Sequence, residues 1–265
     1  MFDFHNHILP NVDDGSTSLE MSLEMLHNAQ NQGITNVVNT VHYQHPKVDG
    51  LNISYKIIRS ELNALQEELK NENINIQLHC GAEVFFLPNI LELKNEPLCT
   101  FSHGKYMLIE FEMHQLPEIN FKKLFELKMN GVTPIIAHPE RYKDVQKDLS
   151  IVESWLKAGC IIQVDAGSVL GKLGKMARIT SEKVIRNNWC QILGSDSHDN
   201  SRRAFCLKDA LEIVSQWIGL NEAKKMVNEN PKAIIEGKPI TFDFEYEPIE
   251  ETNIFYKIIN SIRNK

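Results

Sequence analysis

Apolar positions along the chain follow two spacings, one typical of short buried strands and one typical of amphipathic helices. Short apolar runs predict strands over residues 2–5, 34–41, 74–83, 106–112, 134–137, 160–164 and 191–194. Between them, apolar residues at helical spacing predict helices over residues 18–32, 53–70, 121–129, 151–158 and 175–187.

This alternation predicts a parallel sheet, because parallel strands need a crossover between them. Seven such units within about 200 residues favour one α/β barrel over two domains. We therefore expect a single-domain barrel over residues 1–237. Residues 238–265 are interpreted as an acidic extension, since 239–251 hold acidic residues and no basic one. Apolar residues within 254–262 have the spacing of a short amphipathic helix, which we expect to pack on the same chain.

Composition places the chain among ordinary globular proteins. It has 265 residues, 42% of them hydrophobic, and a net charge of −7. This mildly acidic balance disfavours nucleic-acid binding. The sequence shows no secretory signal and no apolar stretch that could cross a bilayer, so we expect no membrane insertion. Five cysteines without a CxxC pair are typical of reduced thiols, which favours a cytoplasmic location.

Side chains that can bind metal ions follow the ends of the predicted strands. His5 and His7, spaced by two, share one face as the first strand ends, and Asp196 and His198 repeat this spacing after the last strand. The carboxyl ends of parallel barrel strands meet at one rim, where such folds build their sites. We therefore expect one pocket with nine candidate ligands: His5, His7, Asp14, His42, Glu83, Glu110, His138, Asp196 and His198.

Such a pocket predicts bound cations, because buried imidazoles and carboxylates would otherwise repel one another or lie unpaired. Mixed nitrogen and oxygen ligands suit Mn²⁺, Fe²⁺ or Zn²⁺. Carboxylates can also bridge two ions, so two or three divalent ions are expected.

The remaining histidines and one neighbouring aspartate complete the candidate set. His45, in the loop after His42, is expected near the entrance of the pocket. Asp13 can brace the turn before Gly15, so the choice of ligand between it and Asp14 stays open. Four histidines lack a matching strand-end position and are assigned no site role: His27, His79, His103 and His114.

Several motifs in register resemble the polymerase and histidinol phosphatase (PHP) superfamily, in its branch of capsule-associated bacterial protein tyrosine phosphatases. These motifs are residues 3–10 (DFHNHILP), 13–15 (DDG), 81–86 (GAEVFF), 108–111 (LIEF), 134–142 (PIIAHPERY) and 194–198 (GSDSH). The resemblance implies a distorted (β/α)7 barrel of TIM-like type with a trinuclear centre that often contains manganese.

Carried over by position, the resemblance also assigns roles to single residues. Arg141 and Arg203 would hold the phosphate oxygens, with the adjacent Arg202 as an alternative to Arg203. It implies three ions: one on His5, His7, Glu83 and Asp196, a second on Asp14, His42 and His198, and a third on Glu83, Glu110 and His138.

The implied activity is that of a phosphoric monoester hydrolase, a metal-dependent protein tyrosine phosphatase in which a metal-bridging hydroxide attacks phosphorus in line. The implied partner is a phosphotyrosine protein, a bacterial tyrosine kinase of polysaccharide biosynthesis. A cysteine-dependent phosphatase is excluded, because no cysteine has an arginine six positions later. Alternatives are a small-molecule phosphatase such as histidinol phosphatase, a metal-dependent amidohydrolase or deaminase, and a non-catalytic, metal-stabilised binding protein.

Overall fold

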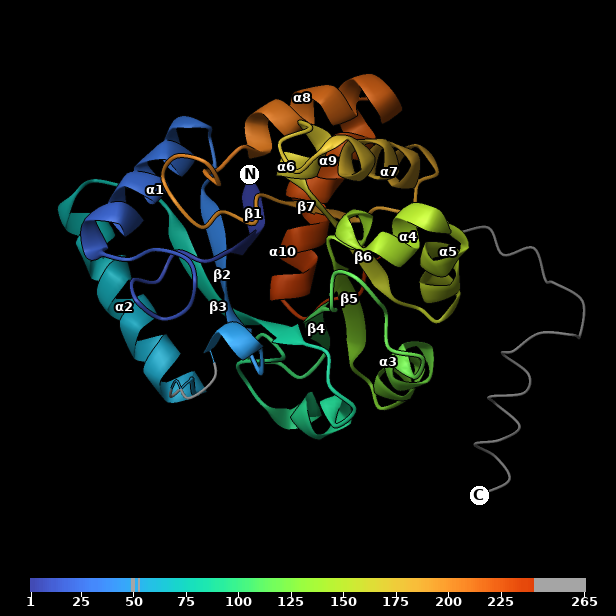
Figure 1. Cartoon of the computed structure of the whole chain (residues 1–265). Helices are drawn as coiled ribbons and strands as arrows, with labels where there is room; N and C mark the ends of the chain where they lie inside the picture. Colours follow the sequence, from blue (N-terminus) through green and yellow to red (C-terminus); the bar gives the residue numbers. More distant parts are fainter. Residues whose placement is uncertain (49–50, 52, 241–265) are drawn as a thin grey trace, which may run out of the picture.

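The computed structural model describes residues 1–48, 51 and 53–240. Within this part of the chain, seven parallel strands form one sheet in the order β1 to β7, which curls into a barrel (Figure 1). The predicted seven-stranded α/β barrel is therefore confirmed. The strands are β1 (Phe2–Asn6), β2 (Asn36–Tyr43), β3 (Gln77–Phe85), β4 (Tyr106–Glu110), β5 (Thr133–Ala137), β6 (Ile161–Asp165) and β7 (Ile192–Gly194).

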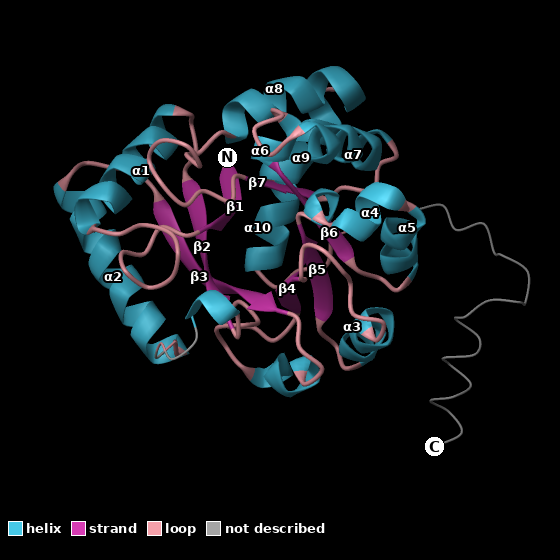
Figure 2. Ribbon diagram, in the orientation of Figure 1, coloured by secondary structure: helices cyan, strands magenta, loops and turns pink. Residues whose placement is uncertain are grey.

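Helices cover the outside of the barrel (Figure 2). The five predicted helices are present with ends shifted by one or two residues, and Ser18 caps the first by accepting a hydrogen bond from the Met21 amide. They are α1 (Leu19–Asn31), α2 (Tyr55–Asn71), α3 (Asn120–Met129), α5 (Ser150–Lys157) and α7 (Lys175–Arg186). The sequence pattern did not predict α4 (Lys143–Lys147), α6 (Ala166–Val169) or the 3₁₀ turns η1 (Pro46–Val48), η2 (Ile90–Asn95) and η3 (Pro139–Arg141).

Three further helices follow β7, where the sequence analysis assigned none. They are α8 (Leu207–Ile218), α9 (Leu220–Val227) and α10 (Glu229–Ile235). Pro231 lies in the first turn of α10, where its missing N–H removes no helical hydrogen bond. The predicted division at residues 237 and 238 stays a prediction, since 241–265, including the predicted helix, lie outside the described residues. No described helix is long and apolar enough to span a membrane.

The barrel closes between its first and last strands. The amide of His7 donates to the carbonyl of Ser197 at 2.9 Å, and the amide of Asp196 donates to the carbonyl of His5 at 2.8 Å. Below these bonds the buried carboxylate of Asp3 accepts from the Ser195 amide at 2.8 Å and from its hydroxyl at 2.5 Å. The seam of the barrel therefore runs between the His5–His7 pair and the segment that carries Asp196.

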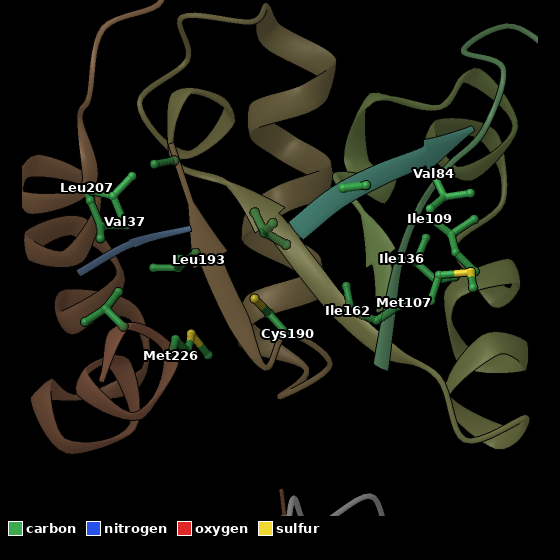
Figure 3. Packing of buried hydrophobic residues seen from close by; sticks show 14 of the residues in the cluster. Val37, Val84, Met107, Ile109, Ile136, Ile162, Cys190, Leu193, Leu207 and Met226 are labelled. Atoms are coloured by element: carbon green, nitrogen blue, oxygen red, sulfur yellow. The ribbon is translucent and has the colours of Figure 1, made fainter. Parts of the chain in front are cut away.

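Alternating strand residues separate two apolar regions. Outward-facing side chains such as Val37, Ile109 and Ile136 pack against the helices (Figure 3). Inward-facing Val38 joins a second cluster, to which α10 contributes Ile234. Two residues further along β2 on the same face lies Thr40, and two beyond that His42, because successive side chains on one face of a strand are spaced by two. The interior thus changes from apolar to polar towards the carboxyl ends of the strands.

Candidate metal centre

The nine side chains predicted as ligands lie together at the carboxyl ends of the strands. His42 and Glu83 lie near the ends of β2 and β3, and Glu110 is the last residue of β4. His138 follows β5 directly, and Asp196 lies two residues after β7. Eight of the nine are buried, while the Asp14 side chain is 32% exposed. The parallel barrel therefore gathers residues from six strands into one pocket.

Their donor atoms form three overlapping groups in which all atoms lie within 4.8 Å of one another. Two groups contain the sets expected for the first and second ions, with His7 added to the second. The third combines His42 with Glu83 and Glu110, whereas His138 was expected there. His138 is nevertheless close, with Nε2 2.9 Å from Glu83 Oε1 and 3.8 Å from Glu110 Oε1. The groups are His5, His7, Glu83 and Asp196; His7, Asp14, His42 and His198; and His42, Glu83 and Glu110.

Six of the buried atoms that face the pocket lack hydrogen-bond partners within the described part of the chain. His5 Nε2 lies 3.1 Å from Glu83 Oε2 and 3.5 Å from Asp196 Oδ1, yet it forms no hydrogen bond with either. Leaving such buried polar atoms unpaired is costly. The donor set therefore fits divalent cations. The other unpaired atoms of this kind are His7 Nε2, His42 Nδ1, Glu110 Oε2, Asp196 Oδ1 and His198 Nε2.

Hydrogen bonds on the far side of two rings orient them towards the pocket. His5 Nδ1 donates to Gln163 Oε1 at 3.0 Å, and His7 Nδ1 donates to Asp13 Oδ2 at 2.7 Å. With Nδ1 protonated, Nε2 of each ring keeps its lone pair for a metal ion. Gln163 and Asp13 thus position two of the expected ligands. Gln163 was not singled out from the sequence, although a polar residue in a buried strand is a usable signal.

Asp13 and Asp14 have different surroundings. Asp13 accepts hydrogen bonds from the amides of Gly15 and His42 at 3.0 and 3.1 Å, and so braces the turn. Asp14 Oδ1 instead lies 3.1 Å from His42 Nε2, inside the pocket. A Cβ atom on Gly15 would lie 2.2 Å from the carbonyl oxygen of His7, so only glycine fits there.

Two of the expected ligands have left-handed backbone conformations that are uncommon outside glycine. The φ angle is 32° at His138 and 47° at Asp196. Such conformations cost about 1–3 kcal/mol and persist where the surroundings enforce them, often at functional sites. At Asp196 the carbonyl also accepts a hydrogen bond from His198 Nδ1 at 2.9 Å, which turns the ring's Nε2 towards the pocket.

Arg141 and Arg203 meet at the edge of the pocket on one carboxylate oxygen. Arg141 Nη1 and Arg203 Nη2 each lie 2.5 Å from Asp196 Oδ2. Arg141 is also 3.5 Å from Asp165 Oδ2. The Arg202 guanidinium forms no ion pair with any described carboxylate. Of the two adjacent arginines, Arg203 is therefore the one placed at the pocket.

The pocket concentrates buried negative charge. Burial opposes ionisation of Glu83, but without a bound ion a protonated His5 ring and the hydrogen bond with His138 hold the Glu83 pKa well below its usual value. Burial and the neighbouring Glu83 raise the pKa of Glu110 to about 8. Burial and Asp196 likewise raise the pKa of Asp165 to about 7. The positively charged side chains nearby do not fully offset the repulsion between these carboxylates. A bound divalent ion would reduce that repulsion.

Two other side chains reach the pocket from the segment after β2. Lys47 Nζ lies 2.6 Å from Asp14 Oδ2, and no pattern in the sequence distinguished this lysine from surface lysines. His45 Nε2 lies 3.6 Å from Glu110 Oε2, at the side of the pocket. Burial and the adjacent His42 lower the pKa of His45 to about 4, so its ring is neutral at pH 7. The four histidines without an assigned role are in none of the three groups formed by the described residues.

The sequence of this chain is similar to those of a known protein family and of two bacterial proteins. The model of a family described as capsular polysaccharide synthesis, CpsB/CapC, matches residues 1–236. The chain is 33% identical to CapC of Staphylococcus aureus over 209 residues, which cover 78% of this chain and 81% of that protein. It is 28% identical over 260 residues to the tyrosine-protein phosphatase YwqE of Bacillus subtilis. This match covers 96% of this chain and 99% of YwqE.

A solved structure is similar over nearly the whole barrel. It comes from crystal structures of YwqE from Bacillus subtilis and CpsB from Streptococcus pneumoniae, described as unique metal-dependent tyrosine phosphatases. It superposes with a TM-score of 0.85 at 28% sequence identity and covers 91% of this chain and 96% of that chain.

Proposed function

Because this chain belongs to the CpsB/CapC family of capsular polysaccharide synthesis, we propose that it is a metal-dependent tyrosine-protein phosphatase. One observation carries the proposal: nine side chains with nitrogen or oxygen donors, His138 included, converge in one pocket, with two guanidinium groups at its edge. Metal ligands and phosphate-binding arginines are the two parts that hydrolysis of a phosphate ester requires.

The side chains are proposed to hold three ions, most suitably Mn²⁺, with Fe or Zn as alternatives, because the donors mix imidazole and carboxylate. When bound, the ions would neutralise phosphate charge and make water at the site more acidic. Glu83 would bridge two of them. The proposed sets are His5, His7, Glu83 and Asp196; Asp14, His42 and His198; and Glu83, Glu110 and His138.

Arg141 and Arg203 are proposed to bind the non-bridging phosphate oxygens. A guanidinium can donate two parallel hydrogen bonds to such an anion. Both groups already lie at the pocket, held by Asp196 Oδ2, so substrate binding needs only that they exchange part of this contact for phosphate. Asp165, near Arg141, would keep that guanidinium in place.

The proposed substrate is phosphotyrosine on a protein, and a bacterial tyrosine kinase of polysaccharide biosynthesis is the proposed partner. The kinase follows from family membership and the resemblance of the motifs. A cytoplasmic location is part of the same proposal. It is supported by five free cysteines, all buried, which suit a reducing compartment.

Hydrolysis of a phosphotyrosine peptide by the purified chain tests the function. We expect release of phosphate with Mn²⁺, loss of activity with a chelator and recovery when Mn²⁺ is returned. Histidinol phosphate serves as the competing substrate, and preferred turnover of it would replace the proposal with a small-molecule phosphatase. Metal binding without turnover of either substrate would support a non-catalytic binding protein.

A further inference from the structure

A cavity of about 510 Å³ opens beside the metal centre, between the segment after β2 and the end of β3. Tyr43, His45 and Val48 contribute to one wall, and Phe85 and Leu87 to the other. The described residues that line it include no Asp, Glu, Lys or Arg. Aromatic and aliphatic side chains around a space of this size are typical of a site for a neutral, apolar group.

His45 lies at the boundary between the cavity and the metal centre. The His45 ring stacks on His42 with centroids 4.5 Å apart, and it meets Phe85 edge to face at 4.8 Å. Its Nε2 is 3.6 Å from Glu110 Oε2. Phe85 is also paired in register with Glu110 across β3 and β4. A group bound in the cavity against His45 and Phe85 would therefore lie close to His42 and Glu110, where an ester oxygen would be held.

We propose that this cavity binds the phenyl ring of phosphotyrosine while the phosphate occupies the metal centre. The inference rests on the proposed function and deepens it, because it assigns residues that select an aromatic ester. The ring would pack against the edge or face of His45 and Phe85, as aromatic pairs prefer. Arg141 and Arg203 hold Asp196, so the charged phosphate and the neutral ring are bound by different sides of the pocket.

The size of the cavity distinguishes aryl from short alkyl phosphates. A phosphoserine side chain or a small alkyl phosphate places no ring beyond the ester oxygen, so it would leave the cavity lined by His45 and Phe85 unfilled. An aryl phosphate would bury apolar surface there, which is favourable in proportion to the area removed from water. Specificity for tyrosine would thus come from the cavity, since the metal centre and the arginines contact only the phosphate.

Binding of two phosphonates tests the proposal without requiring turnover. Phenylphosphonate and methylphosphonate share a head group, and their dissociation constants are measured by calorimetry on the Mn²⁺-loaded full chain. We expect the natural sequence to bind phenylphosphonate about tenfold more tightly, and Phe85→Leu to remove most of that preference. Leu87→Ala is a second variant, in which we expect a smaller loss of the preference for phenylphosphonate. Phe2→Leu is the control, because Phe2 lies at the opposite end of the barrel and stacks on His79.

The outcomes separate the alternatives. No preference in the natural sequence, or a preference unchanged in folded Phe85→Leu and Leu87→Ala, would overturn the proposal. If these variants instead weaken only peptides with apolar residues beside the phosphotyrosine, the cavity binds a flanking residue and the assignment is wrong. Preference for phenylphosphonate without hydrolysis of a phosphotyrosine peptide would support the ring site while rejecting the proposed function.

Discussion

Arg141 and Asp196 form a close ion pair, with Nη1 2.5 Å from Oδ2, while the other oxygen of the same carboxylate faces the metal centre. Asp196 Oδ1 lies 3.5 Å from Nε2 of both His5 and His7. One carboxylate thus joins the proposed phosphate-binding arginines to the proposed first ion.

This arrangement predicts the effect of removing one arginine. In Arg141→Ala, Arg203 still holds Asp196, so the bound metal should remain. The KM for a phosphotyrosine peptide should rise by about ten- to a hundredfold, because a charge-assisted contact with phosphate is lost. Steady-state kinetics and elemental analysis of metal content measure the two effects. Arg202→Ala is the matched control and should change neither. Loss of metal in Arg141→Ala would contradict the role assigned to Arg141.

Replacement of a proposed ligand should affect turnover far more than folding. His42→Ala removes a ring that lies within 3.2 Å of both Asp14 and Glu83. We expect kcat to fall by about two orders of magnitude or more, since charge stabilisation by the ions is a large part of such catalysis. Circular dichroism should show an intact fold. His27→Ala, on the exposed side of α1, provides the control. Full activity of His42→Ala would remove His42 from the site.

Chelation should lower stability as well as activity. Six buried donor atoms of the pocket lack partners in the described structure, so bound ions should stabilise the folded state by an amount that grows with metal concentration. When the free metal concentration is a hundredfold above the dissociation constant, the free energy of unfolding should rise by about 2.7 kcal/mol. Thermal unfolding with and without EDTA, followed by addition of Mn²⁺, measures this difference. An unchanged melting temperature would argue against ions at these residues.

Gly15→Ala should disturb the loop that carries Asp13 and Asp14. The added Cβ would lie 2.2 Å from the His7 carbonyl oxygen, so the loop has to move away from the pocket. We expect reduced metal retention and kcat/KM. Gly104→Ala is the comparison, because its Cβ meets nothing within 4 Å and only the left-handed backbone is penalised, by about 1 kcal/mol. Equal effects of the two substitutions on activity would refute this explanation.

The buried cysteines should resist modification in the folded protein. Burial raises the pKa of the Cys190 and Cys206 thiols to about 12, and that of Cys80 to about 11. At pH 8 these groups therefore stay protonated, and the thiolate is the reactive form. A thiol reagent should react slowly with the native chain and with five groups after denaturation. Rapid reaction of the native protein would show that a cysteine is accessible.

The barrel could be predicted from sequence because the strands are short apolar runs and most of them are followed by a helical pattern. The proposed ligands were recognisable because they follow those runs at a fixed place. By contrast, α8 to α10 were missed although α8 has apolar residues at helical spacing. Lys47 and the choice of Arg203 over Arg202 depend on loop geometry, which local sequence patterns do not specify.

The seam between β1 and β7 also has a consequence during synthesis of the chain. His5 and His7 leave the ribosome first, but their partners Asp196 and His198 emerge only after most of the barrel. Backbone bonds at the seam join these same segments. A nascent chain therefore lacks part of the proposed first and second ligand sets until the seventh strand is available, so hydrolytic activity would begin only with a nearly finished polypeptide.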